Sequence, residues 1–215
     1  MNNLDVTTIL IIAANVLMSF KGFKDISFFD RYKFQISGLL SGEKIRMLSA
    51  GFLHVDTTHL FVNMLTLYFF ADTVVAYVGQ LGFLLIYFGS LLLGNLLSFL
   101  FHKKEPYYTA VGASGAVIGV LYAAILLQPD MMLGLFFIIP IPAYVFGIGY
   151  LLYSIWGMKS NRDSIGHDAH FGGAMGGYVF TILLVPAVLT QHLFMVILLA
   201  APILLLFILK FFKKI

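Results

Sequence analysis

Long apolar segments recur along the whole chain, and most of them are close to the length that crosses a lipid bilayer as a helix. The hydrocarbon core of a bilayer requires about 20 apolar residues per helix. Measured against that length, the sequence predicts seven spans, at about 5–20, 57–78, 81–101, 112–128, 131–155, 168–189 and 192–211. Because most connections are only a few residues long, neighbouring spans are expected to run antiparallel. The sequence therefore predicts an all-α, polytopic helical bundle in a membrane.

The composition agrees with a protein whose solvent is lipid. Of the 215 residues, 60% are hydrophobic and only 11% are charged, whereas a soluble domain carries about 25% charged residues. The absence of cysteine excludes disulfides and thiolate metal sites. The first apolar segment lacks a basic region before it and a cleavage site after it, so we expect a retained span. With no soluble domain or low-complexity linker, we predict one domain over 1–215, embedded in the bilayer and without a nucleic-acid partner.

A serine set among glycines marks the start of the fourth predicted span, in the run Gly112-Ala113-Ser114-Gly115. The first turn of a helix has unpaired backbone N–H groups and the positive end of the helix dipole. Both stabilise negative charge, so this is a suitable place for a nucleophile with an oxyanion hole. The alternative is that Ser114 only caps the helix, while the glycines only allow close packing.

Two polar residues lie one helical turn apart in the second predicted span. His59 and Asn63 are separated by four positions, which places both on one face of a helix. Polar side chains inside a membrane are costly unless they are hydrogen-bonded or functional. A structural alternative is that they form a hydrogen bond holding two spans together.

A histidine and a glycine stripe share one face of the sixth predicted span. His170, Gly173 and Gly177 recur at i, i+3 and i+7, and Gly115 and Gly119 form a similar face in span four. Two glycine faces allow two helix backbones to approach closely. We therefore expect His170 to reach Ser114 and to act as a general base.

A metal site is the competing interpretation of the polar residues. The possible ligands are His54, His59, His167, Asp168 and His170. However, the chain has no His-Glu-x-x-His pattern, and carboxylates are not gathered in the spans. We predict no metal and no other cofactor, and we interpret His167 and Asp168 as the hydrated mouth of their helix.

The three motifs, taken together and in this order, resemble those of the rhomboid intramembrane serine proteases. The resemblance covers about 42–186, since Arg46 and the run Phe52-Leu53-His54 also match, and it identifies 192–211 as an extra helix after a six-helix core of bacterial type. It implies that Ser114 is the nucleophile and His170 the base of a dyad. It also implies an oxyanion hole formed by the backbone N–H of Ser114 and the side chains of His59 and Asn63. The implied substrates are transmembrane segments of other membrane proteins.

The sequence departs from the family pattern at two positions. Ile118 stands where an aromatic residue often packs on the catalytic histidine, and Ile45 replaces a common tryptophan. The resemblance further suggests that Pro140 and Pro142 bend span five beside a lateral substrate gate, and that a loop from Trp156 to Arg162 forms a flap over the site.

The expected sidedness rests on two opposing arguments. All 13 Lys and Arg residues fall on the face onto which the predicted site opens, and the positive-inside rule makes that face cytoplasmic. The resemblance implies instead a site that opens outward from a bacterial inner membrane, and we adopt that orientation.

The alternatives to a protease are an inactive rhomboid-like protein that binds membrane clients, and a transporter or channel. For the last, we find neither repeated halves nor paired intramembrane charges.

Overall fold

The computed structural model describes residues 4–135, 139–160 and 166–212, and it is mostly helical. α1 (Val6–Lys24) begins behind Asp5, whose side chain accepts a hydrogen bond from the backbone N–H of Thr7. α5 (Thr57–His102) is broken at Gly79, where φ is 69° and ψ is 176°. A positive φ of this kind is accessible mainly to glycine. The break divides α5 into two helical arms next to the turn predicted at Gln80.

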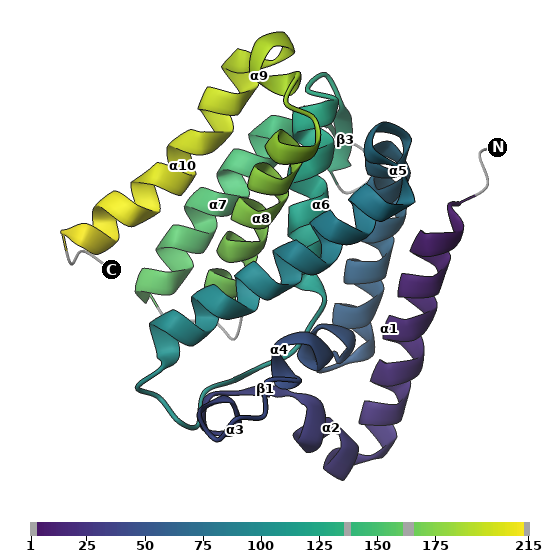
Figure 1. Ribbon diagram of the computed structural model, residues 1–215, viewed down its shortest axis with the longest axis vertical. Coiled ribbons are helices and arrows are strands. Elements are labelled where there is room, and N and C mark those ends of the chain that lie inside the picture. The colour runs from purple at the N-terminus through teal and green to yellow at the C-terminus, as the bar shows by residue number, and fades with distance from the viewer. Residues whose placement is uncertain (1–3, 136–138, 161–165, 213–215) are drawn as a thin grey trace.

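The centre of the fold is formed by α6 (Ser114–Leu127), which packs against both arms of α5 and against α8 (His167–Leu184). Every residue of α6 after Ser114 is buried, as expected for a helix that is apolar on all sides. α1 lies along one side of this core, while α7 (Ala143–Ser160) and α10 (Leu193–Phe211) lie on the other side (Figure 1). A short helix, α9 (Val188–Gln191), precedes α10.

The polar segment between α1 and α5 folds into short elements at one end of the bundle (Figure 1). These are α2 (Ile26–Tyr32), β1 (Phe34–Gln35), α3 (Ile36–Leu40), α4 (Arg46–Ser49) and the 3-10 helix η1 (Ala50–Phe52). β1 pairs antiparallel with β2 (Thr109–Ala110), with Phe34 opposite Ala110. This pairing ties the segment to the loop that leads into Ser114.

The structure corrects the prediction of a helix over 131–155. Its first part is an antiparallel hairpin of β3 (Met132–Leu135) and β4 (Ile139–Pro142), and α7 begins only at Ala143. Proline has no backbone N–H and clashes inside a helix, but an edge strand tolerates it. Pro140 and Pro142 therefore precede the helix and do not bend it.

Three helices in the described part of the chain are long and apolar enough to cross a bilayer, namely α1, α5 and α10. α5 has 46 residues, which is long enough for each of its two arms to span. α6 is apolar but has only 14 residues. The chain is thus a helical membrane protein with several apolar helices, while the count of seven spans stays a prediction.

Candidate active site

Ser114 is the first residue of α6 and lies at the wall of a cavity of about 960 Å³. The loop before it is fixed by a hydrogen bond of 3.0 Å from the Gly112 N–H to the Ala50 carbonyl. Gly112 has a φ of 131°, a conformation that residues with a Cβ rarely adopt. The loop thus delivers the serine to the N-terminus of a buried helix, where developing negative charge is stabilised.

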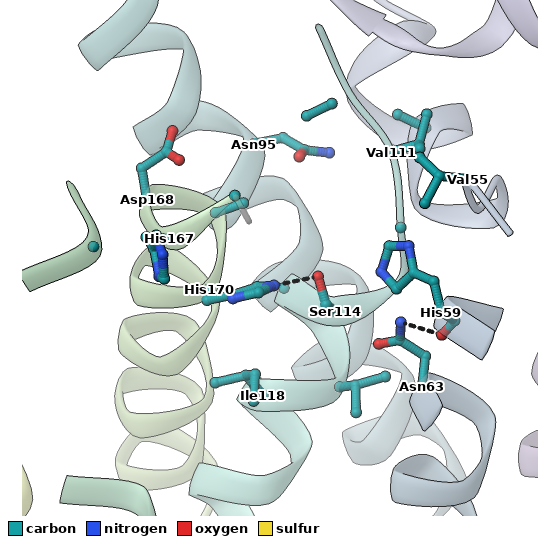
Figure 2. A pocket seen from close by; sticks show the side chains of 18 of the residues that line it. Val55, His59, Asn63, Asn95, Val111, Ser114, Ile118, His167, Asp168 and His170 are labelled. Atoms are coloured by element: carbon teal, nitrogen blue, oxygen red, sulfur yellow. Dashed lines mark hydrogen bonds between the residues drawn. The ribbon is translucent and has the colours of Figure 1, made fainter. Parts of the chain in front are cut away.

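His170 of α8 points toward Ser114, and both residues line the cavity (Figure 2). Its Nε2 lies 2.5 Å from the Ser114 Oγ, and the residue is only 8% exposed. The two side chains are 56 positions apart in the sequence. A hydroxyl bonded to an imidazole nitrogen has the arrangement in which histidine removes the proton of a serine nucleophile.

The second nitrogen of His170 has a partner that the sequence did not indicate. Nδ1 lies 2.6 Å from the hydroxyl of Tyr150, which belongs to α7. The tyrosine ring also lies close to the imidazole, with 5.7 Å between ring centroids. Nothing in the local sequence distinguishes Tyr150 from Tyr144 or Tyr153 on the same helix, so only the tertiary structure identifies it.

His59 and Asn63 lie on the side of Ser114 opposite His170 (Figure 2). The Asn63 Nδ2 donates a hydrogen bond of 2.9 Å to the His59 carbonyl. The His59 ring packs over Gly112, since a Cβ added there would lie 2.7 Å from the ring Cε1. Both side chains line the cavity. Ser114 therefore has an imidazole on one side and two possible hydrogen-bond donors on the other.

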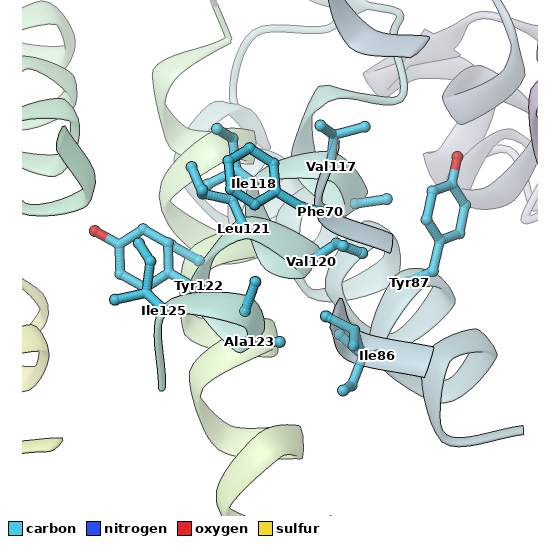
Figure 3. Packing of buried hydrophobic residues seen from close by; sticks show 14 of the residues in the cluster. Phe70, Ile86, Tyr87, Val117, Ile118, Val120, Leu121, Tyr122, Ala123 and Ile125 are labelled. Atoms are coloured by element: carbon cyan, nitrogen blue, oxygen red, sulfur yellow. The ribbon is translucent and has the colours of Figure 1, made fainter. Parts of the chain in front are cut away.

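Close packing of α6 on α8 fixes the distance between the serine and the histidine. A Cβ on Gly173 or Gly177 would approach the carbonyl oxygen of Gly115 or Gly119, respectively, within 3.0 Å, which real Cβ atoms essentially never show. On its other sides α6 is surrounded by apolar residues, among them Phe70, Ile86 and Tyr87 of α5 (Figure 3). The helix that carries Ser114 is thus enclosed along its whole length.

His54 lies behind the serine loop and has a structural environment. Its Nδ1 is 2.8 Å from the Ser19 hydroxyl, and its Nε2 accepts a hydrogen bond of 3.3 Å from the Ala113 N–H. The side chain is fully buried, and burial, together with the nearby His59, lowers the pKa of His54 to about 3. A neutral imidazole thus connects α1 to the loop before Ser114.

Asp168 is buried in a polar cluster beside the cavity. Its two carboxylate oxygens lie 3.5 Å from the His102 Nε2 and from the Tyr108 hydroxyl. Burial and the charge of Asp168 raise the pKa of Tyr108. His167 and Asp168 are each only 3% exposed, yet both line the cavity, so their interpretation as the hydrated mouth of the helix stays a prediction.

The possible metal ligands are separated by the serine. His54 and His59 lie on one side, while His167, Asp168 and His170 belong to α8 on the other. Within residues 4–135, 139–160 and 166–212, no group of three or more His, Cys, Asp or Glu side chains is arranged to hold an ion.

The predicted flap is partly helical. α7 continues to Ser160, so Trp156 belongs to a helix, and Gly157 and Met158 of that helix line the cavity. Arg162, the other end of the predicted flap, lies outside the described residues.

Comparison with known proteins identifies one family. The model of the Rhomboid domain matches residues 41–187. RHOMBOID-like protein 12, mitochondrial, of Arabidopsis thaliana is 28% identical over 186 residues, which cover 79% of this chain and 55% of that protein. Rhomboid protein 1, mitochondrial, of Saccharomyces cerevisiae is 30% identical over 142 residues, or 64% of this chain and 41% of that protein.

A bacterial relative has a more similar length. The putative rhomboid protease YdcA of Bacillus subtilis is 28% identical over 153 residues, which cover 69% of this chain and 71% of that protein. The chain spans about half or less of the length of the two mitochondrial relatives.

Proposed function

Because the chain belongs to the rhomboid family, we propose that it is an intramembrane serine endopeptidase that uses Ser114 and His170 as a catalytic dyad. The observation that carries the proposal is the distance of 2.5 Å between the Ser114 Oγ and the His170 Nε2 at the wall of a cavity. Neither a metal nor another cofactor takes part in the proposed reaction.

The proposed chemistry follows the two-step course of a serine hydrolase. The His170 Nε2 accepts the Ser114 proton as the oxygen attacks the peptide carbonyl, and a tetrahedral intermediate forms. His170 then returns the proton to the leaving amine, which gives an acyl-enzyme and the first product. Water, deprotonated by the same histidine, hydrolyses the ester and regenerates Ser114. His170 alternates between proton acceptor and proton donor through these steps, so the proposed course needs no buried carboxylate.

We assign the stabilisation of the oxyanion to groups on the side of Ser114 that lies away from His170. The backbone N–H of Ser114 lies in the first turn of α6, and the side chains of His59 and Asn63 line the same cavity. A preorganised donor in a site with little water is worth about 3 kcal/mol of barrier. Three such groups supply the electrostatic part of the catalysis.

The proposed substrates are transmembrane segments of other membrane proteins, in particular single-pass helices with small or helix-weakening residues near one end. A helix with all its backbone hydrogen bonds formed offers no carbonyl for attack. Local unwinding therefore has to precede cleavage. With the Pro140 and Pro142 hairpin outside α7, a proline kink no longer supports a gate at that helix.

We further propose seven membrane spans and a bacterial inner membrane, with the site facing outward. The similarity to the Bacillus subtilis protein, which extends over 71% of that protein, supports a bacterial location. The chain has no cysteine, so the variant Lys103→Cys provides a single label beside the site. A membrane-impermeant maleimide should label this cysteine in intact cells. Labelling only after permeabilisation would show that the site faces the cytoplasm.

A client-binding protein without catalysis is the second candidate. Such a protein needs neither a nucleophile nor a base, so the short Ser114 to His170 distance and the donors beyond it favour the enzyme.

The test is labelling of the detergent-solubilised protein with a fluorophosphonate serine probe. We expect the parent and the Ser41→Ala variant, which changes an exposed loop serine, to be labelled. Ser114→Ala should lose the label completely, and His170→Asn should lose nearly all of it. A folded parent that is not labelled would favour client binding.

A further inference from the structure

The base of the proposed dyad is supported from α7 and not from the helix that carries the nucleophile. Ile118 of α6 lies beside His170 of α8 (Figure 2). Its aliphatic side chain offers no hydrogen-bonding group to the imidazole. The Tyr150 hydroxyl lies 2.6 Å from the His170 Nδ1. An aromatic residue from another element therefore supplies both a ring contact and a polar contact.

The reaction determines which way this hydrogen bond points. For Ser114 to donate its hydroxyl proton, the His170 Nε2 has to be unprotonated. The proton of the neutral imidazole is then on Nδ1, and Nδ1–H donates to the Tyr150 oxygen. The opposite direction, with Tyr150 donating to Nδ1, would put the proton on Nε2 and remove the base.

The same acceptor serves the charged form of the histidine. When His170 takes the serine proton, both of its nitrogens carry hydrogen, and Nδ1–H continues to donate to the phenol oxygen. A neutral phenol performs this task without burying a second charge, which would be costly in this environment. Asp168, two residues before His170, is directed to His102 and Tyr108 instead.

Tyr150 is itself held in place by its own helix. Its ring stacks on Phe146 with 5.9 Å between centroids and an interplanar angle of 17°. The Ser154 hydroxyl donates a hydrogen bond of 2.9 Å to the Tyr150 carbonyl. The phenol is therefore a fixed partner for an imidazole on the neighbouring helix.

We propose that Tyr150 is a positioning residue that keeps His170 in the Nδ1–H tautomer and directs its Nε2 at Ser114. The proposal rests on the proposed function, because it assigns a role within that dyad. It makes the activity depend on where α7 lies, since this helix carries the orienting group.

The deciding variant is Tyr150→Phe, which keeps the ring and its stack on Phe146 but removes the oxygen. We expect the rate of fluorophosphonate labelling and the turnover of a transmembrane substrate to fall about 10- to 100-fold, with an unchanged KM and thermal midpoint. Tyr144→Phe removes a hydroxyl from the first turn of the same helix and should retain the parent rate. A Tyr150→Phe rate within a factor of two of the parent rate would overturn the proposal. If the labelling rate and the thermal midpoint of Tyr150→Phe both fall, Tyr150 has a structural role and the proposal is wrong.

A second readout does not depend on activity. In protein labelled with ¹⁵N-histidine, the His170 signal, identified by its loss in His170→Asn, should show protonated Nδ1 in the parent. In Tyr150→Phe it should shift toward protonated Nε2, and an unchanged tautomer would contradict the proposed bond. If the tautomer shifts between the parent and Tyr150→Phe but the parent is not labelled by the probe, the protease assignment fails while the Tyr150 contact stands.

Discussion

Gly173 of α8 lies directly against the backbone of Gly115 of α6, so closely that even a methyl group does not fit between the two helices. Ser114 directly precedes Gly115, and His170 lies about one turn before Gly173. The glycine contact therefore sets the separation across which the imidazole reaches the hydroxyl.

Gly173→Ala is accordingly expected to separate the dyad. Its Cβ would meet the Gly115 carbonyl, which is backbone and cannot rotate away. Overpacking of this kind costs about 1–3 kcal/mol, so both the thermal midpoint and the rate of probe labelling should fall. Gly149→Ala is the matched control, because a Cβ at Gly149 meets nothing within 4 Å and alanine favours a helix by about 1 kcal/mol. Equal labelling of the two variants would contradict the role of the contact.

The fully buried His54 predicts a pH dependence of stability. Its folded pKa, about 3, lies below its ordinary value of 6.5, so folding favours the neutral imidazole. The stabilisation is complete above pH 6.5 and is lost as the pH falls from 6.5 toward 3, at up to about 1.4 kcal/mol per pH unit. Thermal unfolding across this range should show a steeper loss for the parent than for His54→Gln. Parallel curves would mean that His54 does not control the acid limb.

Helix positions were predictable where apolar length alone decides them. The expected segments 112–128 and 192–211 agree with α6 and α10, and the turn near Gln80 agrees with the break at Gly79. The hairpin was missed because its residues are as apolar as a membrane helix, so that only Pro140 and Pro142 distinguish it. Hydropathy indicates that a segment lies in lipid, but it does not distinguish a helix from a strand. Only the two prolines indicate that the backbone here is not helical.

Contacts between distant segments were predictable only in part. The glycine stripes pointed to the pairing of α6 with α8, because small residues leave a recognisable period. Tyr150 left no such signal, since its role depends on where α7 lies in space. The pairing of Phe34 with Ala110 is also a tertiary event between two strands of two residues each, and such short strands have no periodicity.

Arg46 is expected to hold the segment between α1 and α5. Its Nη1 donates hydrogen bonds of 2.8 Å to the carbonyls of Asp30 and of Lys33, and its Nε contacts Glu43. Arg46→Ala would leave two carbonyls without this donor, at a cost of about 0.5–1.5 kcal/mol per hydrogen bond, since Asp30 is exposed and water can take the place of the donor. We expect a lower thermal midpoint and faster proteolysis of this segment. Lys44→Ala, at an exposed neighbouring position, should leave both unchanged, and an equal effect would refute the role of Arg46.

Asn63→Ala tests the oxyanion side of the site. One N–H of the amide is bonded to the His59 carbonyl, which orients the group and leaves its second N–H for the cavity that Asn63 lines. Loss of one oxyanion donor lowers kcat about 10²-fold, whereas KM should change little because the charge develops only in the transition state. Thr66→Val, one turn along α5 and at the wall of the same cavity, is the control for a polar group that makes no oxyanion contact. If both variants lose kcat equally, the effect comes from the shape of the cavity wall. If Asn63→Ala instead raises KM at constant kcat, the amide binds the substrate in its ground state.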